Sequence, residues 1–389
     1  MTISSVRSGK PVPYSLDQSL EIARRSWLRR YCDALGVASL KDLESRCTRA
    51  LLRAIAETGN PSKLPIRLAP VLDRFQISRH IEAIVSGWAS EVEGFGVPPS
   101  LFDEAGCRFV RGGHEGEIYY NERLGQFVIR IRQPCGPRDR NRLRFTFAHE
   151  VAHRLFFVSE GNQWVRAVVR VSEELPEEFR TQARWYLGRV EEKLCNRIAR
   201  RVLIPDTLLA TVWPVDRWFA EEKRFADELL RNAAVFGVSL ITLLVRLKDV
   251  SRPVRETGHF AVWACARYGE RGLSPWPTAR IITGFGPERV GDTLVPWYPG
   301  LDLHSRWPLV ADLVRGQITS GRLEGHFALT VSQRSGTAIQ WEGWWRAMPS
   351  ARNQAETALL LWGRLRAAGH NGVPRVGRSA NNSTGEAGD

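Results

Sequence analysis

The feature that most constrains the fold is a pair of histidines four residues apart, His149 and His153, with Glu150 directly after the first. In an α-helix, residues four apart share a face, so both imidazoles can reach one cation. Glu150 lies one step round the helix, where it can face a water on that cation. The pattern therefore predicts a helix that presents all three side chains at a zinc site.

The residues around this motif predict a buried helix. No Gly or Pro interrupts residues 138–160, and a run without these residues favours helix. Apolar residues recur there at helical spacing, namely Phe145, Phe147, Val151, Leu155 and Phe156. A lone histidine on an apolar helix is usually structural, but two histidines with a glutamate between them favour a metal site.

A catalytic zinc takes three protein ligands and keeps one position open, so a third ligand must come from elsewhere in the chain. Glu192 is the best candidate, on a second predicted helix that ends at Ile204 and Pro205. Its neighbour Glu191 is the rival, because sequence does not fix helix register to one residue. Asn196 lies one turn after Glu192 and is expected to hydrogen-bond a ligand histidine, which favours Glu192.

Together these residues resemble the ImmA/IrrE-type metallopeptidases of bacteria, phages and integrating elements. The resemblance rests on two segments, residues 144–153 (Arg-Phe-Thr-Phe-Ala-His-Glu-Val-Ala-His) and residues 192–205. It extends weakly upstream of these segments and covers roughly residues 64–250 in all. Phe147 departs from the family, which commonly has Leu there, and Arg200 with Arg201 replace small and apolar residues. These departures suggest a more basic surface or a partner contact near the second segment.

The resemblance implies the roles of the site residues. His149, His153 and Glu192 would bind the cofactor, a zinc ion (Zn2+), and Glu150 would be the general base. In such a site zinc acidifies a water and polarises a carbonyl, while the glutamate moves the proton to the leaving amine. The residue that stabilises the oxyanion stays open between four candidates, Tyr119, Tyr120, His114 and Tyr186.

The resemblance also implies a biological role. Members of the family act as zinc-dependent endopeptidases that perform limited proteolysis of a specific regulatory protein, typically a helix-turn-helix transcriptional repressor. The setting is a stress response or the induction of a mobile element. The alternative from a different class is a DNA-binding transcriptional regulator with a structural zinc site.

Composition agrees with a soluble enzyme of more than one domain, with 389 residues and 43% hydrophobic content. No secretory or membrane-spanning segment is evident, so we expect a cytoplasmic protein without a membrane partner. The six cysteines form no Cys-x-x-Cys pair, which indicates reduced thiols. The formal net charge is +13, but the arginines are dispersed, so nucleic acid is a possible partner and not the favoured one.

The predicted fold class is α+β, centred on a zincin-like metallopeptidase domain of helices and a small sheet or hairpin. The expected divisions are an N-terminal helical extension (1–62), the zinc metallopeptidase domain (63–215), a helix-turn-helix-like segment (216–250), a C-terminal mixed α+β sensor or recognition domain (251–370) and a disordered tail (371–389).

Three local patterns complete the expectations. Residues 119–131 predict a hairpin with its turn at 121–125, either buried or with an edge free for an extended peptide. Gly237 and Ser239 predict the turn and cap of the helix-turn-helix-like segment, whose second helix is apolar enough to favour packing over base reading. In the C-terminal part, strands are expected at 259–266, 279–282 and 326–331, and a closing helix at 355–368.

Overall fold

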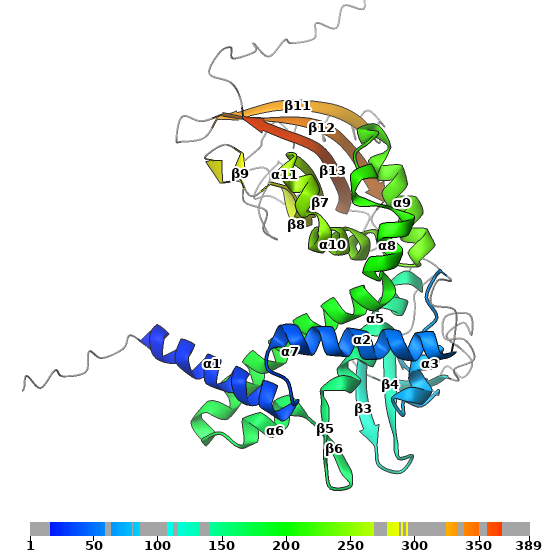
Figure 1. Ribbon diagram of the computed structural model, residues 1–389, viewed down its shortest axis with the longest axis vertical. Coiled ribbons are helices and arrows are strands. Elements are labelled where there is room, and N and C mark those ends of the chain that lie inside the picture. Colours follow the sequence, from blue (N-terminus) through cyan, green and yellow to red (C-terminus); the bar gives the residue numbers. More distant parts are fainter. Residues whose placement is uncertain are drawn as a thin grey trace, which may run out of the picture. The chain divides into compact units, whose positions relative to one another are not determined.

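The computed structural model describes residues 16–58, 64–79, 81–85, 107–111, 116–132, 140–267, 278–287, 289–290, 293–294, 324–332, 338–349 and 356–367 (Figure 1). The chain forms two compact units, one of residues 1–220 and 224–250, the other of residues 221–223 and 251–389. The three segments expected over residues 1–250 thus lie almost entirely within one unit, and both kinds of secondary structure confirm the α+β class.

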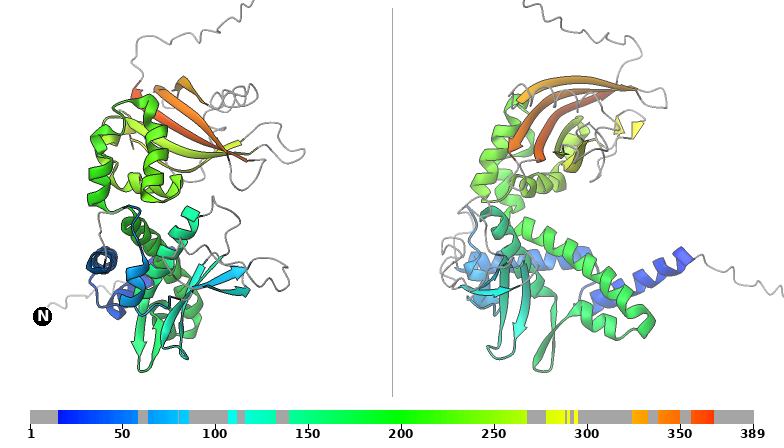
Figure 2. Two further views of the ribbon diagram at one scale, coloured as in Figure 1. Left: turned by 90° about the vertical axis from the view of Figure 1, so that its right-hand side faces the viewer. Right: turned by 180° about the vertical axis from the view of Figure 1, so that it is seen from behind.

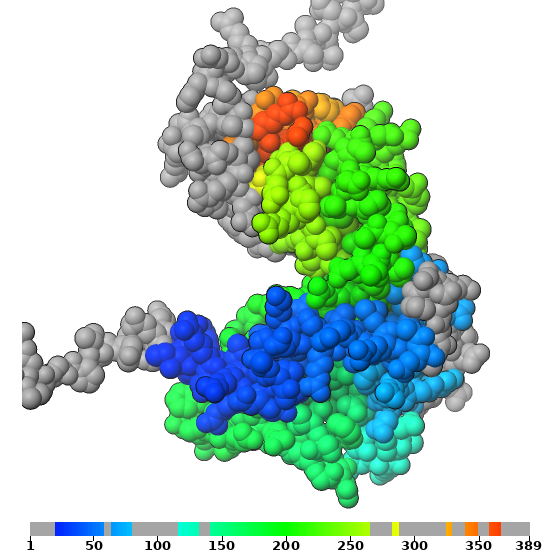
Figure 3. All heavy atoms as spheres, viewed as in Figure 1, coloured from blue at the N-terminus to red at the C-terminus, as the bar shows by residue number. Residues whose placement is uncertain are grey.

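The N-terminal helices are part of the core of the first unit. Helices α1 (Leu16–Ala34) and α2 (Leu40–Thr58) confirm the predicted helical character of this region, and their outer surfaces are blue in Figure 3. Both pack on α7 (Glu177–Leu203), and α1 also contacts α6 (Ala167–Glu173) (Figure 2). Trp27 of α1 is buried against Phe179 of α7. The expected end of this extension at residue 62 lies outside the described residues.

A four-stranded sheet lies in the same unit, after the short helix α3 (Ala69–Arg74). Its strands are β1 (Ile81–Val85), β2 (Cys107–Arg111), β3 (Gly116–Asn121) and β4 (Gln126–Arg132), in the order β2-β1-β4-β3. β1 is parallel to both β2 and β4, whereas β3 and β4 form the predicted antiparallel hairpin. The side-chain oxygen of Asn121 accepts the Arg123 and Leu124 backbone N–H groups in the turn. The hairpin is therefore confirmed, and β3 lies at the edge of the sheet.

The helix that carries the histidine pair is α5 (Arg140–His153). The helical spacing of Leu155 and Phe156 suggests a longer helix, but that expectation is wrong. The chain tightens into the 3-10 turn η2 (Arg154–Phe156) and then forms the hairpin of β5 (Phe157–Glu160) and β6 (Gln163–Arg166). Phe156 is still fully buried, so the core takes up its ring from a different backbone conformation.

The region after α7 consists of short helices. They are α8 (Asp206–Val212), η3 (Val215–Arg217), η4 (Glu222–Arg224), α9 (Phe225–Phe236) and α10 (Leu240–Val250). Gly237 takes a left-handed conformation at the end of α9, and the Ser239 hydroxyl accepts the Thr242 backbone N–H at the start of α10. The expected turn and cap are thus both confirmed.

The helix-turn-helix-like segment packs on the histidine helix. The Arg144 guanidinium donates to the carbonyl oxygens of Phe236 and Gly237 at 2.6 and 3.0 Å, and the Asn141 amide donates to that of Val238 at 3.1 Å. On α10, the buried Arg246 donates to the carbonyl oxygen of Ile204. These contacts agree with packing as the role of this segment.

Substitution of Gly237 tests this junction. Gly237 and Gly125 both have φ of 61°, but an added Cβ at Gly237 would lie 2.5 Å from Arg144 Nη1, whereas at Gly125 it would meet no atom within 4 Å. We expect Gly125→Ala to cost about 1–2 kcal/mol from its backbone alone. Gly237→Ala should cost about 1–3 kcal/mol more from the crowding. Urea unfolding of both variants measures the difference, and equal losses would contradict the packing described.

The second unit is built on a five-stranded antiparallel sheet that follows the short helix α11 (Arg252–Glu256). The strands are β7 (His259–Arg267), β8 (Thr278–Phe285), β11 (Glu324–Ser332), β12 (Ala338–Pro349) and β13 (Glu356–Ala367), in the order β11-β12-β13-β7-β8. A further pair consists of β9 (Arg289–Val290) and β10 (Thr293–Leu294). The strands expected at 259–266, 279–282 and 326–331 are confirmed.

The expectation of a closing helix at residues 355–368 is wrong, because this segment forms the strand β13. β13 is the middle strand of the sheet, and Leu359, Leu360, Leu361 and Trp362 are all buried. A strand covered on both faces has a continuous apolar run in place of an alternating one, so its periodicity cannot be told from that of a buried helix. Its partner β12 does alternate, with Trp341 and Trp345 buried.

The tryptophans of this unit that the structure describes mostly form its core, as Trp341, Trp345 and Trp362 do. Trp344 is half-buried, with the Lys223 ammonium 5.6 Å from the centre of its ring.

The predicted disordered tail, residues 371–389, lies outside the described residues. Within the described part of the chain, no helix combines the length and the apolar character that crossing a membrane requires.

Candidate metal centre

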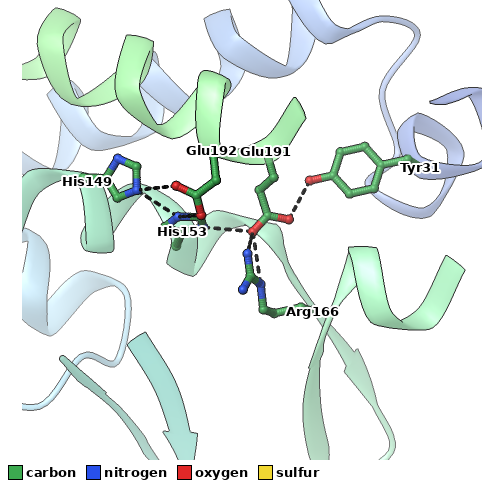
Figure 4. A network of polar contacts seen from close by, with 6 residues as sticks. All are labelled: Tyr31, His149, His153, Arg166, Glu191 and Glu192. Carbon is green, nitrogen blue, oxygen red and sulfur yellow. Dashed lines mark hydrogen bonds and ion pairs between the residues drawn. The ribbon is translucent and has the colours of Figure 1, made fainter. Parts of the chain in front are cut away.

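Helices α5 and α7 bring the three predicted metal ligands together. The Nε2 atoms of His149 and His153 are 3.0 Å apart. One carboxylate oxygen of Glu192 lies 3.1 Å from His149 Nε2, and the other lies 3.2 Å from His153 Nε2 (Figure 4). Among the described residues, these three side chains form a group whose ligand atoms lie close enough together to hold one metal ion.

The chemistry of the donor set fits a metal ion. His153 Nδ1 lies 2.8 Å from a carboxylate oxygen of Glu191, so the ring proton belongs on Nδ1 and the Nε2 lone pair faces His149. Two nitrogen lone pairs and a carboxylate that converge on one point repel one another unless a cation lies between them. Two imidazoles and one carboxylate are the ligands found in catalytic sites of this type.

Exposure separates Glu192 from its neighbour Glu191. The Glu192 side chain is 51% exposed, whereas that of Glu191 is 0% exposed. The close contacts with the His149 imidazole and then with the His153 imidazole hold the pKa of Glu192 below its ordinary value. Although burial raises the pKa of Glu191, the hydrogen bond to His153 and the charge of Arg166 hold it below its ordinary value. Both carboxylates are therefore anions, one at the ligand position and one beneath it.

Glu191, Arg166 and Tyr31 are the site residues that sequence reasoning missed. The sequence offers Glu191 only as an alternative ligand, through its position next to Glu192. The role expected for Asn196 is instead filled by Glu191, on His153. Within the described part of the chain, Asn196 makes no hydrogen bond to either histidine, and His149 Nδ1 is buried without a partner. Tyr31 lies on α1, 160 positions from Glu191, so no local pattern could reveal it.

Glu150 is a residue of α5, and its side chain is buried against the start of β3. Burial raises the pKa of Glu150 above its ordinary value, and the nearby His153 and His149 lower it in part. Gly116 of β3 faces this side chain, since a Cβ added there would lie 2.8 Å from a carboxylate oxygen of Glu150. A carboxylate in such surroundings is suited to take up a proton during a reaction.

The structure places three of the four candidates for oxyanion stabilisation. Tyr119 lies under the Arg130 guanidinium, and Tyr120 packs against Phe127, both on the β3–β4 hairpin. Tyr186 packs on Trp27 at 6.3 Å, within the junction of α1 and α7. The structure thus gives Tyr186 a packing role, while the tyrosines of β3 belong to the edge strand beside Glu150. His114 lies outside the described residues.

A helix pair that presents two histidines and a glutamate to one point, beside a buried glutamate, has the arrangement found in HExxH metallopeptidases. Residues 137–248 match the family model Peptidase_M78, described as the IrrE N-terminal-like domain. This stretch contains α5 and α7 entirely. This match agrees with the resemblance of the chain to the ImmA/IrrE-type metallopeptidases over this stretch.

Two other comparisons add little. No curated protein matches the chain. Among solved structures, a Mycobacterium tuberculosis transcriptional regulator is 18% identical with a TM-score of 0.36, over 88% of this chain and 81% of that chain. A similarity this low supports no inference about fold or function.

Proposed function

We propose that this protein is a zinc-dependent endopeptidase in which His149, His153 and Glu192 hold the metal and Glu150 is the general base. The observation that carries the proposal is the convergence of both Nε2 atoms and the Glu192 carboxylate within about 3 Å of one another, next to a buried Glu150. A zinc ion bound there supplies a Lewis acid that acidifies water and polarises a scissile carbonyl.

The side chains of the protein perform the proton transfers. Glu150 accepts a proton from the attacking water, because its ionised carboxylate is poorly solvated in its buried position. The protonated carboxyl then donates to the amine of the departing peptide, which restores the ionised form. The single carboxylate of Glu192 leaves net positive charge at the metal, which strengthens its action on the carbonyl.

An extended peptide can reach this site along β3. Among the described strands, β3 pairs only with β4 and lies at the edge of the sheet, which is the position where a peptide strand can be added. Gly116 at the start of this strand faces Glu150. The backbone of a substrate strand paired with β3 would therefore pass close to the general base, Glu150.

The substrate we propose is a specific regulatory protein, a helix-turn-helix transcriptional repressor, cut in a stress response or mobile-element induction. The family supports this proposal. Two observations favour it over a DNA-binding regulator with a structural zinc site. The apolar face of α10 is buried in the first unit. Arg197 and Arg201 of α7 pair with Glu44 of α2 at 3.4 and 3.1 Å, so these arginines serve helix packing.

Gly116→Ala tests the contact between β3 and the general base. The added methyl group would lie 2.7 Å from the Thr146 methyl group and 2.8 Å from the Glu150 carboxylate, so Glu150 must move. We expect kcat to fall about 10- to 100-fold while the zinc content stays the same. Gly188→Ala on α7 is the control, because a Cβ there meets nothing within 4 Å. Unchanged kcat in Gly116→Ala would show that Glu150 does not act from this position.

Metal analysis and cleavage of purified protein test the proposed function directly. We expect one zinc per chain and selective cleavage of few proteins in a cell extract. A chelator should abolish the cleavage, added zinc should restore it, and Glu150→Gln should lack it. Chelator-insensitive cleavage, or zinc-loaded protein that cuts nothing in extracts from stressed and unstressed cells, would contradict the proposal.

A further inference from the structure

Glu191 is a buried anion that the proposed reaction does not use directly. One carboxylate oxygen accepts hydrogen bonds from His153 Nδ1 at 2.8 Å and Arg166 Nε at 3.1 Å, and the other accepts the Tyr31 hydroxyl at 2.9 Å. Figure 4 shows these partners converging from three elements, α5, β6 and α1. Burial of a carboxylate is costly unless it is paired, and here every partner is a donor. Such a group calls for a functional reason.

The arrangement fixes one tautomer of His153. The ring lies between two carboxylates, with Nδ1 on Glu191 and Nε2 on Glu192 at 3.2 Å. Because Glu191 accepts a hydrogen bond from Nδ1–H, Nε2 keeps the lone pair that a metal needs. A carboxylate behind a ligand histidine also makes the ring a stronger donor and fixes its orientation.

Tyr31 connects this arrangement to α1. Its side chain is fully buried, its hydroxyl donates to Glu191, and its ring stacks on Phe156 at 6.4 Å with planes 9° apart. Phe156 in turn lies 6.4 Å from the His153 ring. The N-terminal helix thus supports the same histidine by a hydrogen bond through Glu191 and by ring packing through Phe156.

The two histidines differ in this support. His149 Nδ1 is buried with no hydrogen-bond partner among the described residues, whereas His153 Nδ1 is held by Glu191. Of the two imidazoles, His153 is therefore the one whose orientation the protein fixes by hydrogen bonding. Loss of the Glu191 contact would remove the carboxylate that holds His153 Nδ1.

We propose that Glu191, held by Tyr31 of α1 and Arg166 of β6, is a positioning residue that orients His153 for metal binding. Helix α1 then helps to orient a ligand of the metal centre, although it lies outside residues 137–248 that match the family model. This inference rests on the proposed metal site but not on the identity of any substrate.

Metal binding by the full-length chain tests the proposal without a cleavage assay. Zinc affinity is measured by competition with a chelator, and the geometry of the site by the visible absorption of bound cobalt(II). We expect Glu191→Gln to weaken zinc binding about 10- to 100-fold, and Tyr31→Phe, which keeps the ring, about 3- to 10-fold. Both variants should change the cobalt spectrum.

Thr48→Val is the matched control. Thr48 lies on α2 with a buried hydroxyl that has no hydrogen-bond partner among the described residues, so its removal should leave the network intact and zinc affinity unchanged. If folded Tyr31→Phe and Glu191→Gln bound both metals as wild type does, and lost only unfolding free energy, the residues would be merely structural and the inference wrong. Wild-type protein that bound neither metal would overturn the proposed function itself.

Discussion

Glu150→Gln is expected to keep its zinc and to lose hydrolysis by about 100- to 10,000-fold. Glutamine has the size of glutamate and fits the same buried space beside Gly116. Its amide cannot take a proton from water, so the general base is lost while the three ligands stay. The measurement is kcat of the zinc-loaded variant against wild type, with zinc content determined on the same samples.

The same experiment separates two interpretations of the site. Loss of cleavage together with loss of zinc would mean that the substitution disturbed the ligands. Full cleavage by a zinc-loaded Glu150→Gln would contradict the role of Glu150, whatever the substrate. A stable, inactive and metal-loaded variant would also serve to capture the substrate, because binding along β3 needs no proton transfer.

His153→Ala is expected to lose both zinc and hydrolysis. The substitution removes one of three ligands and leaves Glu191 without its imidazole donor, still buried beside Arg166. Loss of a positioning partner alone weakens metal binding about 10- to 100-fold, so loss of the ligand itself should exceed that range. Zinc retained after dialysis, measured as metal per chain, gives the result.

His326→Ala provides the control for this substitution. His326 lies in the second unit with a side chain that is 44% exposed, and it is outside the ligand group. Its zinc content should equal that of wild type. One tightly bound zinc in His153→Ala would contradict the assignment of the ligands.

The helix that carries the histidine pair could be predicted because the pattern that indicates it lies within the helix itself. The spacing of His149 and His153, with apolar residues around them, both requires a helix and places the ligands on one face. The second helix was equally predictable up to its end before Pro205, and the turn at Gly237 follows from the need for a left-handed residue. The choice of Glu192 over Glu191, however, rests on the spacing to Asn196 and on the family resemblance rather than on periodicity.

The residues that hold Glu191 in place could not be predicted, because they are distant from it in the sequence. Tyr31 and Arg166 reach Glu191 from α1 and β6, and nothing in the residues around Tyr31 indicates a metal centre 160 positions away. The strand β13 was mistaken for a helix for a related reason. Burial of both its faces depends on neighbours, β12 and β7, that are set by the sheet and not by the local pattern.

The most direct test of the central claim compares newly exposed protein N-termini in cells that express wild type or Glu150→Gln, with and without DNA damage or oxidative stress. A selective zinc endopeptidase predicts new termini in a few proteins, present only with wild type, and a helix-turn-helix repressor among them. Identical termini in both strains under every condition, from proteins shown to carry zinc, would contradict it.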